Sequence, residues 1–160
     1  IILWQGNKKI DAKKKFWKNL NLLVEKNYHP PSISSVDNYC RFSKELLKNN
    51  NLASFNVLNK SLYVMKLKKI NAKSFVKKSK WGFFYELDIN KLQNIKHLIK
   101  KKLQTITYFG YSKKFLVKFF SENNFNGIDR IVPIGQALNI NLVWDGYDLT
   151  TKLTREIEIR

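Results

Sequence analysis

The sequence lacks most of the residues that disulfide frameworks, metal sites and hydrolytic triads require. Cys40 is its only cysteine, so no disulfide can form within the chain, and we expect a cytoplasmic protein in a reducing environment. The two histidines, His29 and His97, lie far apart and provide no zinc-ligand set with one cysteine. They also stand in no serine–histidine–aspartate context. The sequence therefore predicts no metal site and no triad.

Glycine and long hydrophobic runs are also scarce. Six glycines occur, and none forms a Gly-x-Gly-x-x-Gly or Walker pattern, so the chain shows no nucleotide-binding loop of its own. No apolar run approaches the roughly 20 residues that cross a bilayer, which predicts no transmembrane segment. Residues 1–4 are typical of a strand already under way, and the only methionine is Met65. We therefore expect a fragment of a longer reading frame.

Positive charge is what the chain has in excess. Lysine and arginine number 30 against 12 acidic residues, for a net charge of +18. Such basicity favours nucleic acid or an anionic surface as a partner, and residues 66–81 interleave lysines with Phe75 and Trp81, which can stack on bases. However, arginine occurs only four times and no nucleic-acid module is matched. We interpret the charge as mainly a solvated surface and keep a small basic binding module as the alternative function.

The hydrophobic pattern alternates between strand and helix periods, and 44% of the residues are hydrophobic, which supports a folded core. Alternation of this kind predicts the α/β class, with a three-layer, mostly parallel sheet, helices on both faces, and a single domain over residues 1–160. The elements that we predict, in order, are strand 1–5, helix 11–28, helix 34–48, a hairpin of strands 54–58 and 61–67, an irregular loop 68–80, strand 83–89, helix 90–102, strand 104–109, helix 112–124, strand 129–134, helix 145–153 and strand 154–159.

The second predicted helix decides how Cys40 is interpreted. Ser34 or Ser35 is expected to cap this helix, as Asp11 is expected to cap the first. Free cysteine is among the most buried residue types, so Cys40 is expected to be a core residue rather than a nucleophile. The side chains that the helical spacing predicts to face inward are Val36, Tyr39, Cys40, Ser43, Leu46 and Leu47.

Three uncommon motifs occur in residues 103–160. Leu103-Gln-Thr opens one predicted strand, Gly127-Ile-Asp-Arg-Ile-Val-Pro forms another, and Trp144-Asp-Gly follows them. In this order they resemble the C-terminal end of the bacterial acyl-CoA reductases of the bioluminescence type, which belong to the aldehyde dehydrogenase superfamily. Residues 1–102 are similar to that family in the order of their elements.

This resemblance implies part of an enzyme. The family reduces a fatty acyl thioester to the aldehyde with NADPH, through a covalent acyl-cysteine. In the superfamily the nucleophile precedes a strand and a long helix, so the resemblance places it upstream of residue 1, together with the dinucleotide-binding domain. Cys40 comes one helix too late to match it. The chain is thus expected to be the C-terminal half of an aldehyde-dehydrogenase-like catalytic domain, with no catalytic residue and no activity alone.

The resemblance also implies ligand contacts. In related aldehyde dehydrogenases a loop before a strand contacts the nicotinamide ribose, and Trp81 and Gly82 occupy the corresponding place, although the loop has no glutamate.

Further along the chain, Gln104 and Thr105 begin a strand, while Trp144 and Asp145 form a turn. These four are the candidate substrate-binding residues, with the alternative that Trp144 packs and Asp145 caps the following helix. The expected partners are an acyl-CoA or acyl-protein thioester and further copies of the full-length protein. No specific nucleic acid is expected.

Overall fold

The structure is a computed structural model that describes residues 1–69, 80–125 and 127–159. Most of the loop predicted over residues 68–80, including Phe75, lies outside the described residues. The chain forms two compact units, residues 1–95 and 96–160, and each is described by itself below. Both contain helices and strands, so the predicted α/β class is confirmed.

The first unit contains a four-stranded mixed sheet in the order β1-β4-β3-β2. Strand β4 (Phe83–Asp88) is parallel to both β1 (Ile2–Trp4) and β3 (Leu62–Leu67). Strand β2 (Leu52–Asn59) is antiparallel to β3, which confirms the predicted hairpin. The two sheet partners of β4 are thus β1 and β3, which both precede it in the chain.

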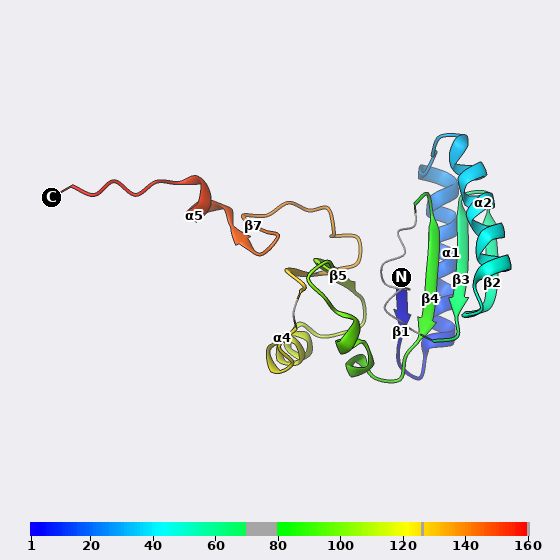
Figure 1. The fold of residues 1–160 in the computed structure, drawn as a ribbon, viewed down its shortest axis with the longest axis horizontal. Helices are drawn as coiled ribbons and strands as arrows, with labels where there is room; N and C mark the ends of the chain where they lie inside the picture. The colour runs from blue at the N-terminus through cyan, green and yellow to red at the C-terminus, as the bar shows by residue number, and fades with distance from the viewer. Residues whose placement is uncertain (70–79, 126, 160) are drawn as a thin grey trace. The chain divides into compact units, whose positions relative to one another are not determined.

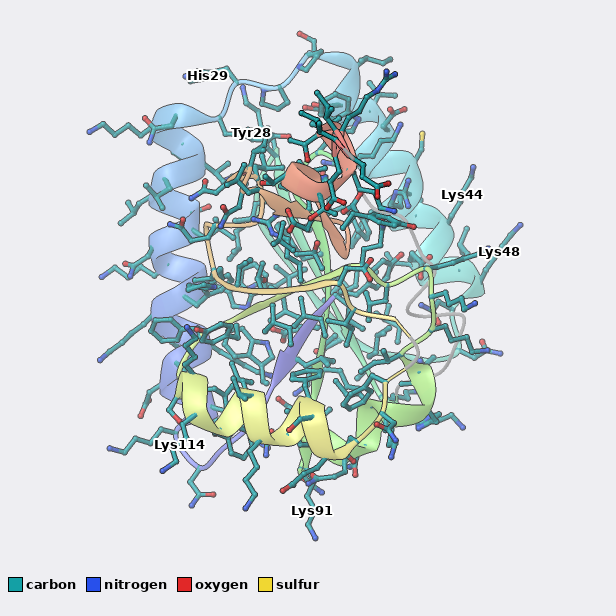
Figure 2. All side chains as sticks on the ribbon, turned by 90° about the vertical axis from the view of Figure 1, so that its left-hand side faces the viewer. Tyr28, His29, Lys44, Lys48, Lys91 and Lys114 are labelled. Carbon is teal, nitrogen blue, oxygen red and sulfur yellow. The ribbon has the colours of Figure 1, made fainter. Side chains whose placement is uncertain are left out.

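Helices α1 (Lys9–Asn27) and α2 (Ile33–Lys48) lie on opposite faces of this sheet (Figures 1 and 2). Successive side chains of a strand point to opposite faces, so each helix meets alternate residues of β3 and β4. On one face, Trp17 of α1 packs edge-on against Phe84. On the other, Phe42 of α2 packs against Tyr63. Residues 1–95 thus bury aromatic side chains on both sides of the sheet.

A buried carboxylate ties α1 to β1 and β4. Glu86 is 7% exposed, and its Oε2 accepts hydrogen bonds from the indole nitrogens of Trp4, at 2.8 Å, and Trp17, at 3.0 Å. The Lys13 ammonium lies 3.5 Å from the other oxygen of Glu86 and 2.6 Å from Asp88 Oδ1. Because residues 86 and 88 are two apart on a strand, both carboxylates face α1.

Asp88 makes the stability of the first unit depend on pH. Burial opposes its ionisation, but hydrogen bonds from Lys13 and Lys66 outweigh burial and hold the pKa of Asp88 below its usual value. A carboxyl whose pKa is depressed by folding stabilises above its unfolded pKa, and this contribution is lost as pH falls through the folded pKa. We expect the urea concentration at the unfolding midpoint to decrease as the pH is lowered from about 5 to 3. This decrease should be less steep in Asp88→Asn. Equal slopes would show that Asp88 does not contribute.

The inward face of α2 differs from the predicted one. Ser34 and Asn38 are the buried residues of this helix, whereas Leu47 is 83% exposed and Cys40 is exposed. The prediction that Cys40 is a core residue is therefore wrong. Asn38 faces the sheet because its side-chain nitrogen donates to the carbonyl of Trp81 at 2.8 Å. Helix periodicity identifies an apolar stripe, but a polar contact between distant segments decides which side packs.

The helix caps also differ from those predicted. Ser32, rather than Ser34 or Ser35, is the residue that precedes α2. Asp11 lies inside the first turn of α1, where its negative charge stabilises the helix by interacting with the positive end of the helix dipole.

The second unit contains the strand–helix–strand arrangement that the glycine spacing predicts. Strand β5 (Thr105–Tyr108), helix α4 (Lys113–Glu122) and β6 (Arg130–Pro133) follow one another, and the two strands are parallel. The predicted cap is confirmed, because Ser112 Oγ accepts a hydrogen bond from the backbone N–H of Phe115. Leu116 and Phe119 are buried as predicted.

The predictions for the helix before β5 and for the end of the chain are partly wrong. A 3-10 helix, η1 (Leu92–Leu98), replaces the predicted helix 90–102. Its first turn has no acidic residue, and in an α-helix Lys96 and Lys100 would be like charges four residues apart, which repel one another. Near the end, β7 (Val143–Trp144) and β8 (Tyr147–Asp148) form a hairpin before the short helix α5 (Leu149–Leu153). Residues 154–159 pair with no strand among the described residues. Within the described ranges, no helix has the length and apolar character needed to cross a membrane.

Candidate functional site

Arg130 organises the second unit around its guanidinium group. From β6, Nη1 donates to the carbonyl of Ala137 at 2.8 Å, and Nη2 donates to the carbonyls of Gln136 and Asn139. The guanidinium carbon also lies 4.5 Å from the ring centroid of Trp144, a cation–π distance. One side chain therefore holds the loop after β6 and the tryptophan of the later hairpin in a single arrangement.

The neighbouring Asp129 approaches the turn of that hairpin. A Cβ placed on Gly146 would lie 3.2 Å from Asp129 Oδ1, a tight contact at a position whose φ of +79° already favours glycine. Asp145 and Gly146 have φ of 48° and 79°, the left-handed pair that a tight two-residue hairpin turn requires. Asp145 is thus a turn residue. The predicted capping role belongs to Asp148, which accepts from the backbone N–H of Thr150 at 2.9 Å.

Gln104 and Thr105 join the same cluster through the backbone. The carbonyl of Gln104 accepts hydrogen bonds from the backbone N–H groups of Asp129, at 2.8 Å, and Arg130, at 3.0 Å. Thr105 is the direct partner of Arg130 in the β5–β6 pairing. We define the Arg130 cluster as Gln104, Thr105, Asp129, Arg130, Trp144, Asp145 and Gly146.

The Arg130 cluster contains all four candidate substrate residues, and its central member was not among them. Arg130 and Asp129 stand in one of the three motifs that suggested the family. The signal was available, because an arginine is rare in this lysine-rich chain and its planar fork suits several carbonyl acceptors at once.

The forked shape of the Arg130 guanidinium should contribute more to the order of the loop after β6 than its positive charge does. We expect Arg130→Lys to raise the hydrogen-exchange rates of the Gln136 and Asn139 amides roughly tenfold, because one ammonium cannot replace a guanidinium that spans three carbonyls. The matched control is Arg155→Lys, an exposed arginine in the same unit. Equal exchange in the two variants would contradict the organising role.

Trp81 and Gly82 lie in the first unit and are explained by packing. Trp81 has φ of 56°, and its carbonyl accepts the hydrogen bond from Asn38. The carbonyl of Gly82 accepts from the N–H of Tyr63 at 3.0 Å. A Cβ on Gly82 would lie 1.9 Å from the carbonyl oxygen of Ser61. The backbone of this loop is thus committed to contacts with α2 and the β2–β3 hairpin.

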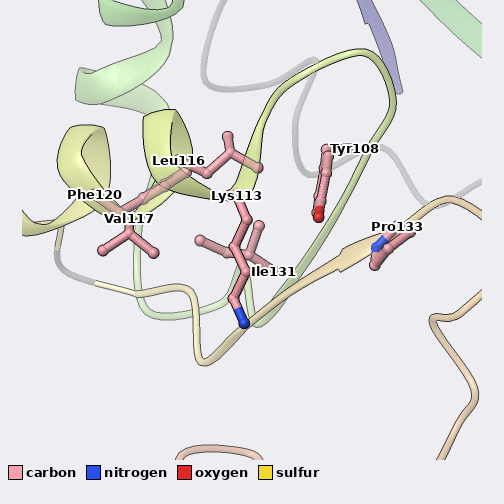
Figure 3. Close-up of a pocket in the computed structure, with 7 residues that line it drawn as sticks. All are labelled: Tyr108, Lys113, Leu116, Val117, Phe120, Ile131 and Pro133. Carbon is pink, nitrogen blue, oxygen red and sulfur yellow. The ribbon is translucent and has the colours of Figure 1, made fainter.

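An apolar pocket of about 580 Å³ opens between β5, α4 and β6 (Figure 3). Its size falls within the roughly 300–1,000 Å³ of small-molecule sites. Lys113 provides an ammonium group and Tyr108 a hydroxyl, and Figure 3 shows the Lys113 side chain running past Ile131. None of the four candidate substrate residues lines it. The residues that line it are Tyr108, Lys113, Leu116, Val117, Phe120, Ile131 and Pro133.

Other reactive side chains show no grouping. His29 and His97 are exposed, and the described residues contain no group of three or more histidine, cysteine or acidic side chains suited to a metal ion. Comparison with known proteins adds no assignment, since no protein-family model and no curated protein matches the chain.

Proposed function

We propose that this chain is the C-terminal part of an NADPH-dependent fatty acyl thioester reductase, with a partial three-layer aldehyde-dehydrogenase-like fold. The observation that supports this most is the Arg130 cluster. Three stretches up to 40 residues apart resemble the reductase family, and all three meet at Arg130: its backbone N–H donates to the Gln104 carbonyl, and its guanidinium group lies against the ring of Trp144. Chance similarity between short stretches would not require them to contact one another.

The pocket supports a role in binding the acyl group. Apolar side chains from α4 and β6 suit an aliphatic chain, and burial of each methylene contributes roughly 0.8 kcal/mol. The Lys113 ammonium suits an anionic group on the same molecule, such as the phosphates of coenzyme A or of a carrier-protein thioester. The contribution of this chain is then binding and positioning, and the nucleophilic cysteine is expected upstream of residue 1.

The contacts of Trp81 and Gly82 do not support the cofactor role that the resemblance implies. Both carbonyls accept hydrogen bonds within the protein, and the space beside Gly82 is filled by the Ser61 carbonyl. We therefore assign no step of the reaction to these two residues.

Filling the pocket should change the preference for acyl length. In the full-length protein, we expect Val117→Trp to raise KM for a long-chain acyl thioester roughly tenfold and to leave a two-carbon thioester unaffected, because only the long chain needs the pocket. The control is Val143→Trp, since Val143 is 57% exposed, close to the 60% of Val117, and lies outside the pocket. A similar change for both thioesters would contradict an acyl pocket.

Two experiments test the proposed enzyme: sequencing the DNA upstream of the codon for Ile1, and an activity assay on the isolated chain. The proposal expects an open frame that encodes a cysteine shortly before Ile1 and a dinucleotide-binding domain before that. The isolated 160 residues should oxidise no NADPH in the presence of an acyl thioester. A start codon directly before Ile1, or salt-sensitive binding of DNA by the chain, would favour the basic binding module instead.

A further inference from the structure

Helix α2 presents an apolar stripe to solvent on the side opposite the sheet. Ile33 is 61% exposed, Val36 55% and Leu47 83%, and Cys40 is exposed between them. At 3.6 residues per turn these positions fall on one face, whose centre lies about 150° around the helix from the buried Ser34 and Asn38. We call Ile33, Val36, Cys40 and Leu47 the α2 stripe. A helix that packs on one face and is apolar on the other is suited to a second helical contact.

The α2 stripe is self-complementary about its centre. Cys40 lies seven residues from Ile33 and seven residues from Leu47. If a second α2 packs antiparallel with the two-fold axis at Cys40, Ile33 of one copy meets Leu47 of the other at both ends. A two-fold interface requires this reciprocity, in which residue i contacts residue j and j contacts i.

The charges beside the stripe match the same arrangement. Asp37 and Lys44 are exposed on one flank of α2, and Figure 2 shows Lys44 and Lys48 projecting from the helix. Asp37 lies three residues before Cys40, and Lys44 lies four residues after it. The two-fold axis brings each flank onto the same flank of the other copy, so Asp37 of one helix comes opposite Lys44 of the other, twice in the interface. Although the chain carries +18, α2 itself carries only three basic and two acidic residues.

We propose that the α2 stripe is a homodimer interface, in which two copies of α2 pack antiparallel across Cys40. A single helix pair is small for a stable interface, so the dimer should dissociate on dilution. Repulsion between two basic chains should also make the dimer tighter at moderate salt than at very low salt.

Charge reversal provides the sharpest test. The dimer dissociation constant of the 160-residue chain is measured by sedimentation under reducing conditions. Asp37→Lys and Lys44→Asp should each raise this constant roughly tenfold, because each places two like-charge pairs in the interface. The double variant should return to within about twofold of the parent, because both pairs are restored with reversed sign. A monomeric parent chain, or a double variant no tighter than the singles, would overturn the proposal.

A cross-link at Cys40 tests the position of the axis. A short bismaleimide should convert the chain to a covalent dimer through its single cysteine, and Leu47→Ser should reduce the yield several-fold. Leu153→Ser is the control, because Leu153 is 81% exposed and Leu47 is 83% exposed. A dimer that forms normally but is not cross-linked, or equal yields in the two variants, would place the interface elsewhere. Coverage of the stripe by a segment upstream of residue 1 would appear in the full-length protein as the loss of this cross-link, and that loss would also overturn the proposal.

Discussion

Replacing Glu86 with alanine should lower the free energy of unfolding of the first unit by about 3–5 kcal/mol. The carboxylate is buried, and it is the acceptor for the indole N–H groups of Trp4 and Trp17 and a partner of Lys13. Alanine leaves the buried indole donor of Trp17, the half-buried one of Trp4 and the Lys13 ammonium without that acceptor, and each then loses its compensation for having left water. Urea unfolding followed by tryptophan fluorescence measures the effect, since three of the four tryptophans, Trp4, Trp17 and Trp81, lie in this unit.

Two further variants test whether a loss of stability in Glu86→Ala comes from the buried acceptor or simply from removing a carboxylate. Glu122→Ala removes a carboxylate that is 60% exposed and 3.9 Å from Lys118, so it should change stability by less than about 0.5 kcal/mol. Glu86→Gln keeps the shape of the side chain and one acceptor oxygen, but its amide group brings a donor to the place of the second oxygen. The free energy of unfolding of this variant should lie between those of the parent and of Glu86→Ala. If Glu86→Ala behaves like Glu122→Ala, the network contributes little to folding.

Elements defined by local pattern could be predicted from the sequence. The β2–β3 hairpin, strand β4 and the β5–α4–β6 unit follow from hydrophobic alternation, from the Ser112 cap and from glycine punctuation. These signals lie within one or two turns of chain.

Predictions that depend on distant contacts were less successful. The face of α2 is set by Asn38 reaching the Trp81 carbonyl, 43 residues away, and by Phe42 packing on Tyr63. Neither contact can be recognised from the helical spacing of apolar residues, and that spacing predicted the solvent-exposed side of α2 as the packed side. The place of β4 in the sheet likewise depends on pairing with β1, more than 80 residues earlier, which periodicity does not encode.

The candidate site was predicted in part. The motifs identified Gln104, Thr105, Trp144 and Asp145, and the structure brings them together around Arg130. The turn predicted at Trp144 and Asp145 is confirmed, and Asp-Gly between short apolar segments is typical of a two-residue hairpin turn; the alternative that Asp145 caps the following helix is wrong. An aspartate before a helix resembles a cap equally well, and Asp148, three residues later, occupies the cap. The pocket could not be predicted, because its lining combines side chains from three elements.

Replacing Gly82 with alanine should lower the free energy of unfolding of the first unit by about 3 kcal/mol or more. Its φ of +80° disfavours any residue with a Cβ, and that Cβ would lie 1.9 Å from the Ser61 carbonyl oxygen. Ser61 cannot easily move, because its N–H donates to Asn59 Oδ1 at 2.7 Å in the turn of the β2–β3 hairpin.

Gly6→Ala is the matched control for that variant. Gly6 lies in the same unit with φ of +99°, and no atom lies within 4 Å of a Cβ placed there, so its replacement should cost only the backbone strain of about 1–2 kcal/mol. The difference between the two urea midpoints isolates the clash with Ser61. If the midpoints coincide, the contact between the Trp81–Gly82 loop and the hairpin is looser than the structure shows. Space beside Gly82 would then exist for a ligand, and the cofactor contact that the resemblance implies would regain its physical basis.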